Sequence, residues 1–153
     1  MQKTLLYRFF GVGRIPGALR AELESEGILL ADEGIGGWQV NKNLRAPGRM
    51  KWYEVRSFTG FLAVTKHRLV AQTYGTRQLD VPLDDARLSA VRASSPTERR
   101  ITLSFDYETF RPGWRGLTEL RFNTPKASAF YETLTGLGLH ADGAGLSVQR
   151  GLR

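Results

Sequence analysis

The 153-residue chain contains no cysteine. This absence excludes a disulfide framework and thiolate metal sites, and it is typical of a reducing compartment. Only two histidines, His67 and His140, are present, and no HExxH motif, Ser/His/Asp order or cysteine nucleophile accompanies them. The glycines match neither GxGxxG nor a Walker sequence. We therefore expect a protein that is not an enzyme and that uses no metal or cofactor.

Long apolar runs are also missing. No stretch approaches the roughly 18 apolar residues that a membrane-spanning helix needs. The apolar run near the N-terminus is interrupted by Arg8, and no small-residue cleavage site follows it. We expect an unexported, cytoplasmic protein in which Leu5, Leu6, Phe9 and Phe10 lie buried on the domain surface. An interfacial membrane anchor is the alternative for this segment.

Acidic residues are outnumbered, with 15 Asp and Glu against 22 Lys and Arg, a net charge of +7. This balance favours anionic partners. Nucleic acid is not expected, because the chain has no recognisable module in which stacking aromatic residues alternate with basic ones. We expect a protein partner or a homo-oligomer, with an anionic membrane surface as a further possibility that would leave the protein peripheral to the membrane.

Short β-rich runs dominate the middle of the chain. Residues 58–65 and 69–74 flank a polar break at residues 66–68, a spacing that predicts a hairpin. The predicted strands are 27–31, 38–44, 52–65, 69–74, 77–83, 88–93, 100–106 and 117–122. A bend or bulge is predicted at Gly36 and Gly37, and Pro82 should lie in an edge strand or a bulge.

Turns and loops separate these runs. We expect turns at residues 45–49, 84–85 and 94–98, where Pro, Gly, Asp or Ser cluster, and a loop over residues 107–116.

Two helices are predicted. The first covers residues 15–26, with Pro16 at its first position and Gly27 as its C-terminal cap. It should dock through Ala18, Leu19 and Leu23, and Arg20 is positioned to reach Glu24 on its surface.

The second helix follows Thr124, with Pro125 at its first position, and ends at Gly136. Its apolar stripe comprises Ala127, Phe130, Tyr131 and Leu134. The resulting organisation is an N-terminal segment and helix over 1–26, a β-rich domain over 27–136 and a tail over 137–153.

The ordered set of motifs resembles the pleckstrin-homology-like (PH-like) superfamily, notably its bacterial and GRAM-like branches. The motifs are Glu26-Gly27-Ile28-Leu29-Leu30, Gly60-Phe61-Leu62-Ala63-Val64-Thr65 with Arg68-Leu69-Val70, and Leu79-Asp80-Val81-Pro82-Leu83-Asp84-Asp85. The resemblance covers residues 27–136. It implies a mainly β fold with some helix: a partly open antiparallel barrel of about seven strands, capped by the C-terminal helix. The helix at 15–26 is an addition to that pattern, and Trp114 lies in a loop, whereas many eukaryotic members have a tryptophan in the final helix.

The same resemblance implies a function without catalysis, since such domains bind phospholipid headgroups, peptides or other protein surfaces. A different barrel remains an alternative, because Gly36-Gly37-Trp38 contains the Gly-x-Trp triplet of lipocalins. That interpretation predicts a carrier of small apolar ligands with a cavity inside the barrel.

A basic stretch is the candidate binding site. Lys42, Arg45, Arg49 and Lys51 fall within ten positions that contain no acidic residue, and Trp52 and Tyr53 follow them. In the resemblance this stretch is the first hairpin loop, where lipid-binding members hold anionic headgroups. We predict that these four cations and Trp52 bind an anionic surface, assisted either by the avidity of an oligomer or by insertion of Trp52 or Leu44.

Overall fold

The structure, a computed structural model, describes residues 13–141. The predicted N-terminal cluster of Leu5, Leu6, Phe9 and Phe10 and residues 142–153 of the predicted tail lie outside the described residues. The strands are β1 (Ile28–Ala46), β2 (Arg49–Thr65), β3 (Arg68–Thr73), β4 (Thr76–Pro82), β5 (Arg92–Thr97), β6 (Arg100–Asp106), β7 (Arg115–Asn123) and β8 (His140–Ala141). The helices are α2 (Gly17–Glu26), η1 (Ala86–Ala90), α3 (Tyr107–Phe110) and α4 (Ala127–Gly136). No helix between residues 13 and 141 is long and apolar enough to cross a membrane.

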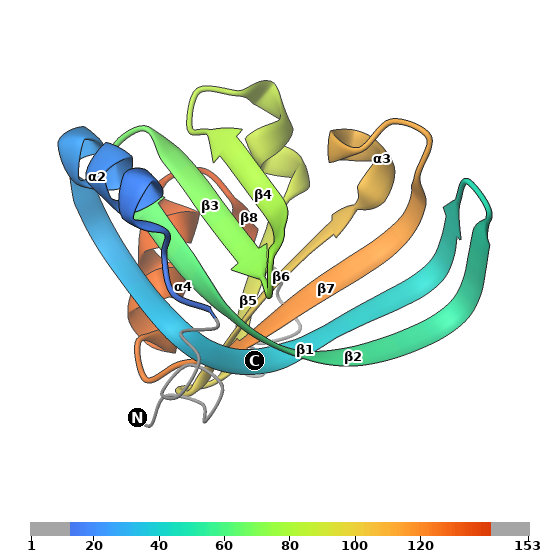
Figure 1. Cartoon of the computed structure of the whole chain (residues 1–153). Helices are drawn as coiled ribbons and strands as arrows, with labels where there is room; N and C mark the ends of the chain where they lie inside the picture. Colours follow the sequence, from blue (N-terminus) through green and yellow to red (C-terminus); the bar gives the residue numbers. More distant parts are fainter. Residues whose placement is uncertain (1–12, 142–153) are drawn as a thin grey trace, which may run out of the picture.

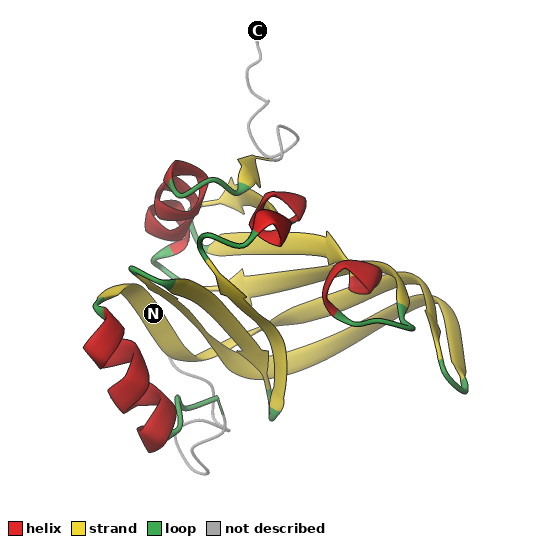
Figure 2. Ribbon diagram, turned by 90° about the horizontal axis from the view of Figure 1, so that it is seen from above, coloured by secondary structure: helices red, strands yellow, loops and turns green. Residues whose placement is uncertain are grey.

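The eight strands form one sheet that curls into an open half-barrel (Figures 1 and 2). The strand order is β4-β3-β2-β1-β7-β6-β5-β8, and every pair is antiparallel except β5 with β8. The predicted mainly β class, with an N-terminal and a C-terminal helix, is confirmed. Strand β8 was not predicted, because it has only two residues and lies in the stretch predicted as a tail.

The predicted hairpins are present. The chain turns at Lys66 and His67, between β2 and β3, and at Pro47 and Gly48, between β1 and β2. Pro82 ends β4, which is an edge strand of the sheet, as predicted.

β1 is a single strand of 19 residues, so the prediction of two strands separated by a bend at Gly36 and Gly37 is wrong. The irregularity falls instead between Glu33 and Ile35, around Gly34, whose φ is +67°. Gly37 serves a different purpose. A Cβ atom there would lie 2.0 Å from the carbonyl oxygen of Arg121 on β7, so the close approach of the two strands needs glycine.

The core lies on both faces of β2. Inside the half-barrel, a large cluster includes Leu62 and Phe122 from the sheet and Phe130 from α4, each fully buried. On the opposite face, Leu19 and Leu23 of α2 pack in a second cluster with residues of β2 and β3. Alternation along β2 explains this, because successive side chains point to opposite faces of a strand.

Helix α2 docks as predicted through Leu19 and Leu23, but Ala18 is exposed. Arg20 forms an ion pair with Glu33 on β1 and not with Glu24. The ionic contact therefore joins the helix to the sheet.

Helix α4 is present and ends at Gly136 as predicted, but it begins at Ala127, two residues after Pro125. The hydroxyl of Thr124 accepts a hydrogen bond from the Lys126 N–H (3.1 Å) and donates one to Asp32 on β1 (2.7 Å). The predicted apolar stripe faces the core. Ala127, Phe130 and Leu134 are buried, and Tyr131 is half-buried.

Three further predictions were wrong in the region after β4. Residues 88–93 were predicted as a strand, but residues 86–90 form η1, which the Asp85 carboxylate caps by accepting a hydrogen bond from the Arg87 N–H (2.8 Å). β5 then continues through the predicted turn at 94–98 as far as Thr97. The predicted loop at 107–116 begins with α3, capped in the same way by Asp106.

Candidate functional site

The outer half of the β1–β2 hairpin projects from the half-barrel (Figure 1). We call residues 38–57 the arm. β3 pairs with β2 only from Gly60 to Val64, so in the described sheet the arm residues of β2 pair only with β1. On the other side, β7 pairs with β1 as far as Arg45. The arm is thus a supported hairpin with one open edge.

Exposed apolar side chains are concentrated on the arm. Those with the largest exposed fractions are Trp52 (79%), Met50 (65%) and Tyr53 (61%), and Trp38 and Val55 are also exposed. Strand alternation places Met50 and Trp52 on the same face as the core residue Phe58, and Tyr53 and Val55 on the opposite face. Both faces of the arm therefore present apolar surface to solvent.

The predicted basic residues all lie on the arm, but two of them are neutralised. The Nζ atom of Lys42 lies 3.1 Å from a carboxylate oxygen of Glu119 on β7, and Arg49 pairs with Glu54 at 3.0 Å. The side chains of Arg45 and Lys51 are exposed and form no ion pair or hydrogen bond with any residue in the described range 13–141. The predicted cluster therefore has two free cations.

Both neutralising carboxylates stay ionised. Burial raises the pKa of Glu119, but hydrogen bonds from Arg121 and Lys42 outweigh burial and hold that pKa below its ordinary value. Burial likewise raises the pKa of Glu54, but the hydrogen bond from Asn41 and the charge of Arg49 lower it by more. The pKa of Glu54 is therefore also below its ordinary value. The arm, residues 38–57, is itself strongly basic, and counting Glu119 of β7 with it leaves a net charge of +3. Its cations Lys42, Arg45, Arg49, Lys51 and Arg56 oppose the single acid Glu54, a net charge of +4.

A buried polar network fixes the arm to the rest of the domain. The hydroxyl of Tyr107 on α3 donates to the side-chain oxygen of Asn41 (2.7 Å) and accepts a hydrogen bond from Gln39 (2.9 Å). Asn41 in turn donates to Glu54 on the partner strand (2.9 Å). Both Gln39 and Asn41 are buried.

Sequence reasoning missed one member of the exposed surface and misplaced another. Met50 was not selected, although its spacing of two from Trp52 puts the two side chains on one face of a strand. Leu44, predicted as an inserting residue, is fully buried and cannot insert.

Two acidic side chains outside the arm, Asp85 and Asp106, have structural partners. Asp85 caps η1 and forms an ion pair with Arg87, and Asp106 caps α3. Within the described part of the chain, no three His, Asp or Glu side chains lie close enough together to hold a metal ion.

Comparison of the chain with protein-family models, with curated proteins and with solved structures gives no match. Function is therefore inferred from the arm itself.

Proposed function

We propose that this protein is a non-enzymatic, PH-like interaction module that binds an anionic membrane surface through the arm. One observation is decisive: a projecting hairpin of net charge +4 exposes Met50 and Trp52 on one face and Tyr53 on the other. The protein would be cytoplasmic and would bind the membrane reversibly, as a peripheral protein.

The PH-like assignment has support in the order of elements. Seven antiparallel strands follow one another in the sheet, and α4 then packs its buried stripe against the interior, next to β5 and β6. This arrangement agrees with the bent sheet and C-terminal helix that the resemblance implies.

The exposure of both faces favours a membrane over a protein partner. A single protein surface covers one face of a hairpin and leaves the apolar groups of the other face in water. A lipid interface surrounds an inserted tip and covers both faces together. Tryptophan and tyrosine are also enriched at such interfaces, where their rings meet the headgroup region.

The charge of the arm disfavours a symmetric dimer. A two-fold interface places the same patch of each copy against the other. Here it would bring a net charge of +4 against +4, and like charges across an interface oppose association. An anionic surface removes this repulsion.

Insertion of the apolar side chains contributes more to the free energy of membrane binding than the free cations do. Arg45 and Lys51 each contribute about 1 kcal/mol near an acidic membrane, and burying Met50 and Trp52 contributes roughly 1.5–3 kcal/mol each. The sum of about 5–8 kcal/mol corresponds to a dissociation constant between about 0.2 mM and about 1 μM. Charge directs the arm to the membrane, and insertion holds it there.

Liposome co-sedimentation tests the proposal, with phosphatidylserine-containing and pure phosphatidylcholine vesicles at low and high salt. We expect the wild type to bind the anionic vesicles more strongly at low salt. The Met50→Ser, Trp52→Ser variant should lose more binding than the Arg45→Ser, Lys51→Ser variant. The Lys66→Ser, Arg99→Ser variant removes two exposed cations outside the arm and is the matched control. It should lose only the small contribution of overall charge to binding and should otherwise bind like the wild type. Absence of wild-type binding, or equal binding by all variants, would contradict the proposal.

A further inference from the structure

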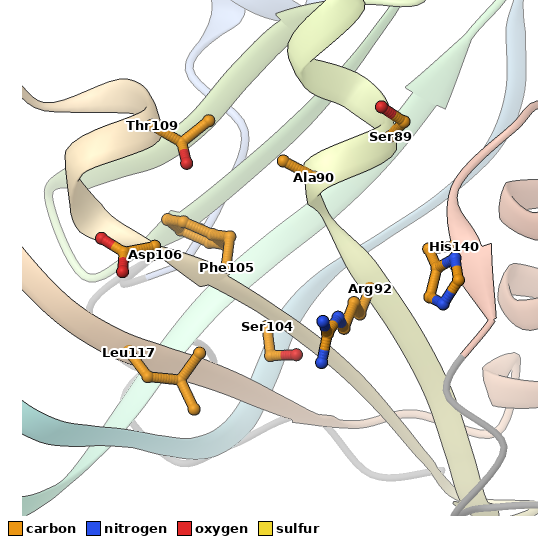
Figure 3. A pocket seen from close by; sticks show the side chains of 9 residues that line it. All are labelled: Ser89, Ala90, Arg92, Ser104, Phe105, Asp106, Thr109, Leu117 and His140. Carbon is orange, nitrogen blue, oxygen red and sulfur yellow. The ribbon is translucent and has the colours of Figure 1, made fainter.

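A second surface, separate from the exposed faces of the arm, is an open cleft of about 430 Å3 between η1, α3 and the β5–β6 ladder (Figure 3). This volume lies within the range of small-molecule sites, roughly 300–1,000 Å3. Its lining side chains come from six elements, η1, β5, β6, α3, β7 and the short strand β8.

One end of the cleft is cationic. Arg92 on β5 pairs with His140 on β8 in the parallel ladder and with Ser104 on β6 in the antiparallel ladder. Neighbouring strands lie about 5 Å apart, so the three side chains converge on one region, as Figure 3 shows. A guanidinium, an imidazole and a hydroxyl are together suited to hold an oxyanion.

The polar side chains at this end of the cleft are available to a ligand. Arg92 and the Ser104 hydroxyl make no hydrogen bond or ion pair with any residue between 13 and 141. The neighbouring cleft over the same sheet differs, because Arg121 there is paired with Glu119 and Arg100 is hydrogen-bonded to Asn123. Of these two clefts, the first therefore offers a free guanidinium and the second does not.

The other end of the cleft accepts hydrogen bonds. Asp106 lies two residues after Ser104 on β6, about 7 Å away along the strand, and Thr109 of α3 lies beside it (Figure 3). The Oδ1 atom of Asp106 accepts the Glu108 N–H (2.9 Å), and its second oxygen makes no hydrogen bond with the described residues. A carboxylate here repels a second anionic group, so it selects a ligand with one charged end and one hydroxylated end.

We infer that the cleft binds a small sugar phosphate or polyol phosphate. Its phosphate monoester lies against Arg92, His140 and Ser104, because the planar guanidinium matches phosphate oxygens with two parallel hydrogen bonds. Its hydroxyl groups donate to Asp106, and Leu117, opposite Asp106 in the β6–β7 ladder, provides apolar contact beside them.

Isothermal titration calorimetry of the full chain with glucose 6-phosphate, inorganic phosphate and glucose tests this inference. We expect saturable binding of glucose 6-phosphate, weaker binding of phosphate and none of glucose. Arg92→Gln should weaken glucose 6-phosphate binding at least about tenfold. Arg99→Gln, which removes an exposed charge at the opposite end of the β5–β6 hairpin, should change it less than about twofold. Circular dichroism of each variant verifies folding.

Asp106→Asn keeps a side chain that caps α3 and should weaken the binding of glucose 6-phosphate but not that of phosphate. Absence of saturable glucose 6-phosphate binding, or equal losses in Arg92→Gln and Arg99→Gln, would overturn the inference. Vesicles that contain phosphatidylinositol 4-phosphate separate a lipid headgroup from a soluble ligand. Arg92-dependent binding to those vesicles without binding of glucose 6-phosphate would overturn the assignment to a soluble ligand. The vesicle measurements use the Arg45→Ser, Met50→Ser, Lys51→Ser, Trp52→Ser background, which removes the free cations and the inserting side chains of the arm and leaves the cleft intact, so their result does not depend on membrane binding by the arm.

Discussion

At the scale of single residues, glycine sets how closely the strands approach. A Cβ atom at Gly60 on β2 would lie 1.9 Å from the carbonyl oxygen of Gln72 on β3. The neighbouring atom is backbone and part of a strand ladder, so it cannot move aside as the end of a flexible side chain could. The pairing of β2 with β3 therefore depends on the missing side chain.

Replacing Gly60 with alanine should lower the free energy of unfolding by about 1–3 kcal/mol or more, because the strands must separate to make room. Gly75 is the matched control. An added Cβ at Gly75 meets nothing within 4 Å, so Gly75→Ala should change stability by less than about 0.5 kcal/mol. Urea denaturation of both variants measures the difference, and equal stabilities would contradict the close approach.

The Tyr107 hydroxyl is the second residue-scale test. Tyr107→Phe leaves Gln39 and Asn41 buried without this partner, and an unsatisfied buried polar group costs about 1–3 kcal/mol. Tyr131 is a suitable control, because it is half-buried and its hydroxyl makes no hydrogen bond with the described residues. Tyr131→Phe should leave the free energy of unfolding nearly unchanged. A Tyr107→Phe variant as stable as Tyr131→Phe would mean that the network contributes nothing.

At the scale of elements, charged groups link β1 to β7. Glu119 accepts hydrogen bonds from Arg121 (2.7 Å) on its own strand and from Lys42 (3.1 Å) on β1. Burial raises the pKa of Glu119, but these hydrogen bonds lower it by more. The pKa therefore lies below its ordinary value of 4.5. Below about pH 5 the unfolded chain therefore takes up a proton at this position before the folded chain does, so stability falls as the pH falls.

Glu119→Gln removes this titration. The stability difference between wild type and Glu119→Gln should therefore be largest near pH 7 and should shrink as the pH falls from about 5 to about 3. Thermal denaturation across this pH range measures the difference. Glu132→Gln, at an exposed site whose side chain forms no ion pair in the described structure, is the control for replacing a carboxyl group with an amide. A constant difference for Glu119→Gln would show that the contact with Lys42 and Arg121 does not stabilise the fold.

Local chemistry predicted some elements well. The turn at Pro47 and Gly48, the turn at Lys66 and His67 and the strand Arg100–Asp106 all follow from short polar breaks and strict alternation. η1 was mistaken for the start of a strand, since its apolar Leu88 is followed closely by the β5 segment and the capping role of Asp85 only appears in the folded chain. The length of β1 depends on pairing with β2 and β7, which no local pattern reveals.

The candidate site was predicted only in part, for the same reason. The sequence located the basic stretch and Trp52, but the acid that neutralises Lys42 is 77 residues away in the chain. The burial of Leu44 is also set by tertiary structure: Leu44 lies opposite Lys51 in the β1–β2 ladder, beside Asn43, which has φ +55° and lies at a register shift opposite β7. Distant partners therefore decide which charges are free and which apolar groups are exposed.

At the scale of the whole molecule, β1 joins the two halves of the sheet. It pairs with β2, which leads to β3 and β4, and with β7, which leads to β6 and β5. The main core cluster also contains side chains from both halves, such as Leu62 and Leu103, together with Phe130 of α4. Neither half can bury its apolar face without the other.

This arrangement predicts one cooperative unfolding transition. Trp38 and Trp52 report on the arm and Trp114 on the segment before β7, whereas far-ultraviolet circular dichroism reports on the whole sheet. The two signals should change at the same urea concentration, as for a two-state domain. Gly37→Ala should shift both midpoints together, because the added Cβ would meet the Arg121 carbonyl oxygen at the junction of β1 and β7. A fluorescence transition at lower urea than the circular dichroism transition would show that the arm unfolds separately. The apolar surface proposed for membrane insertion would then not be held in place by the half-barrel.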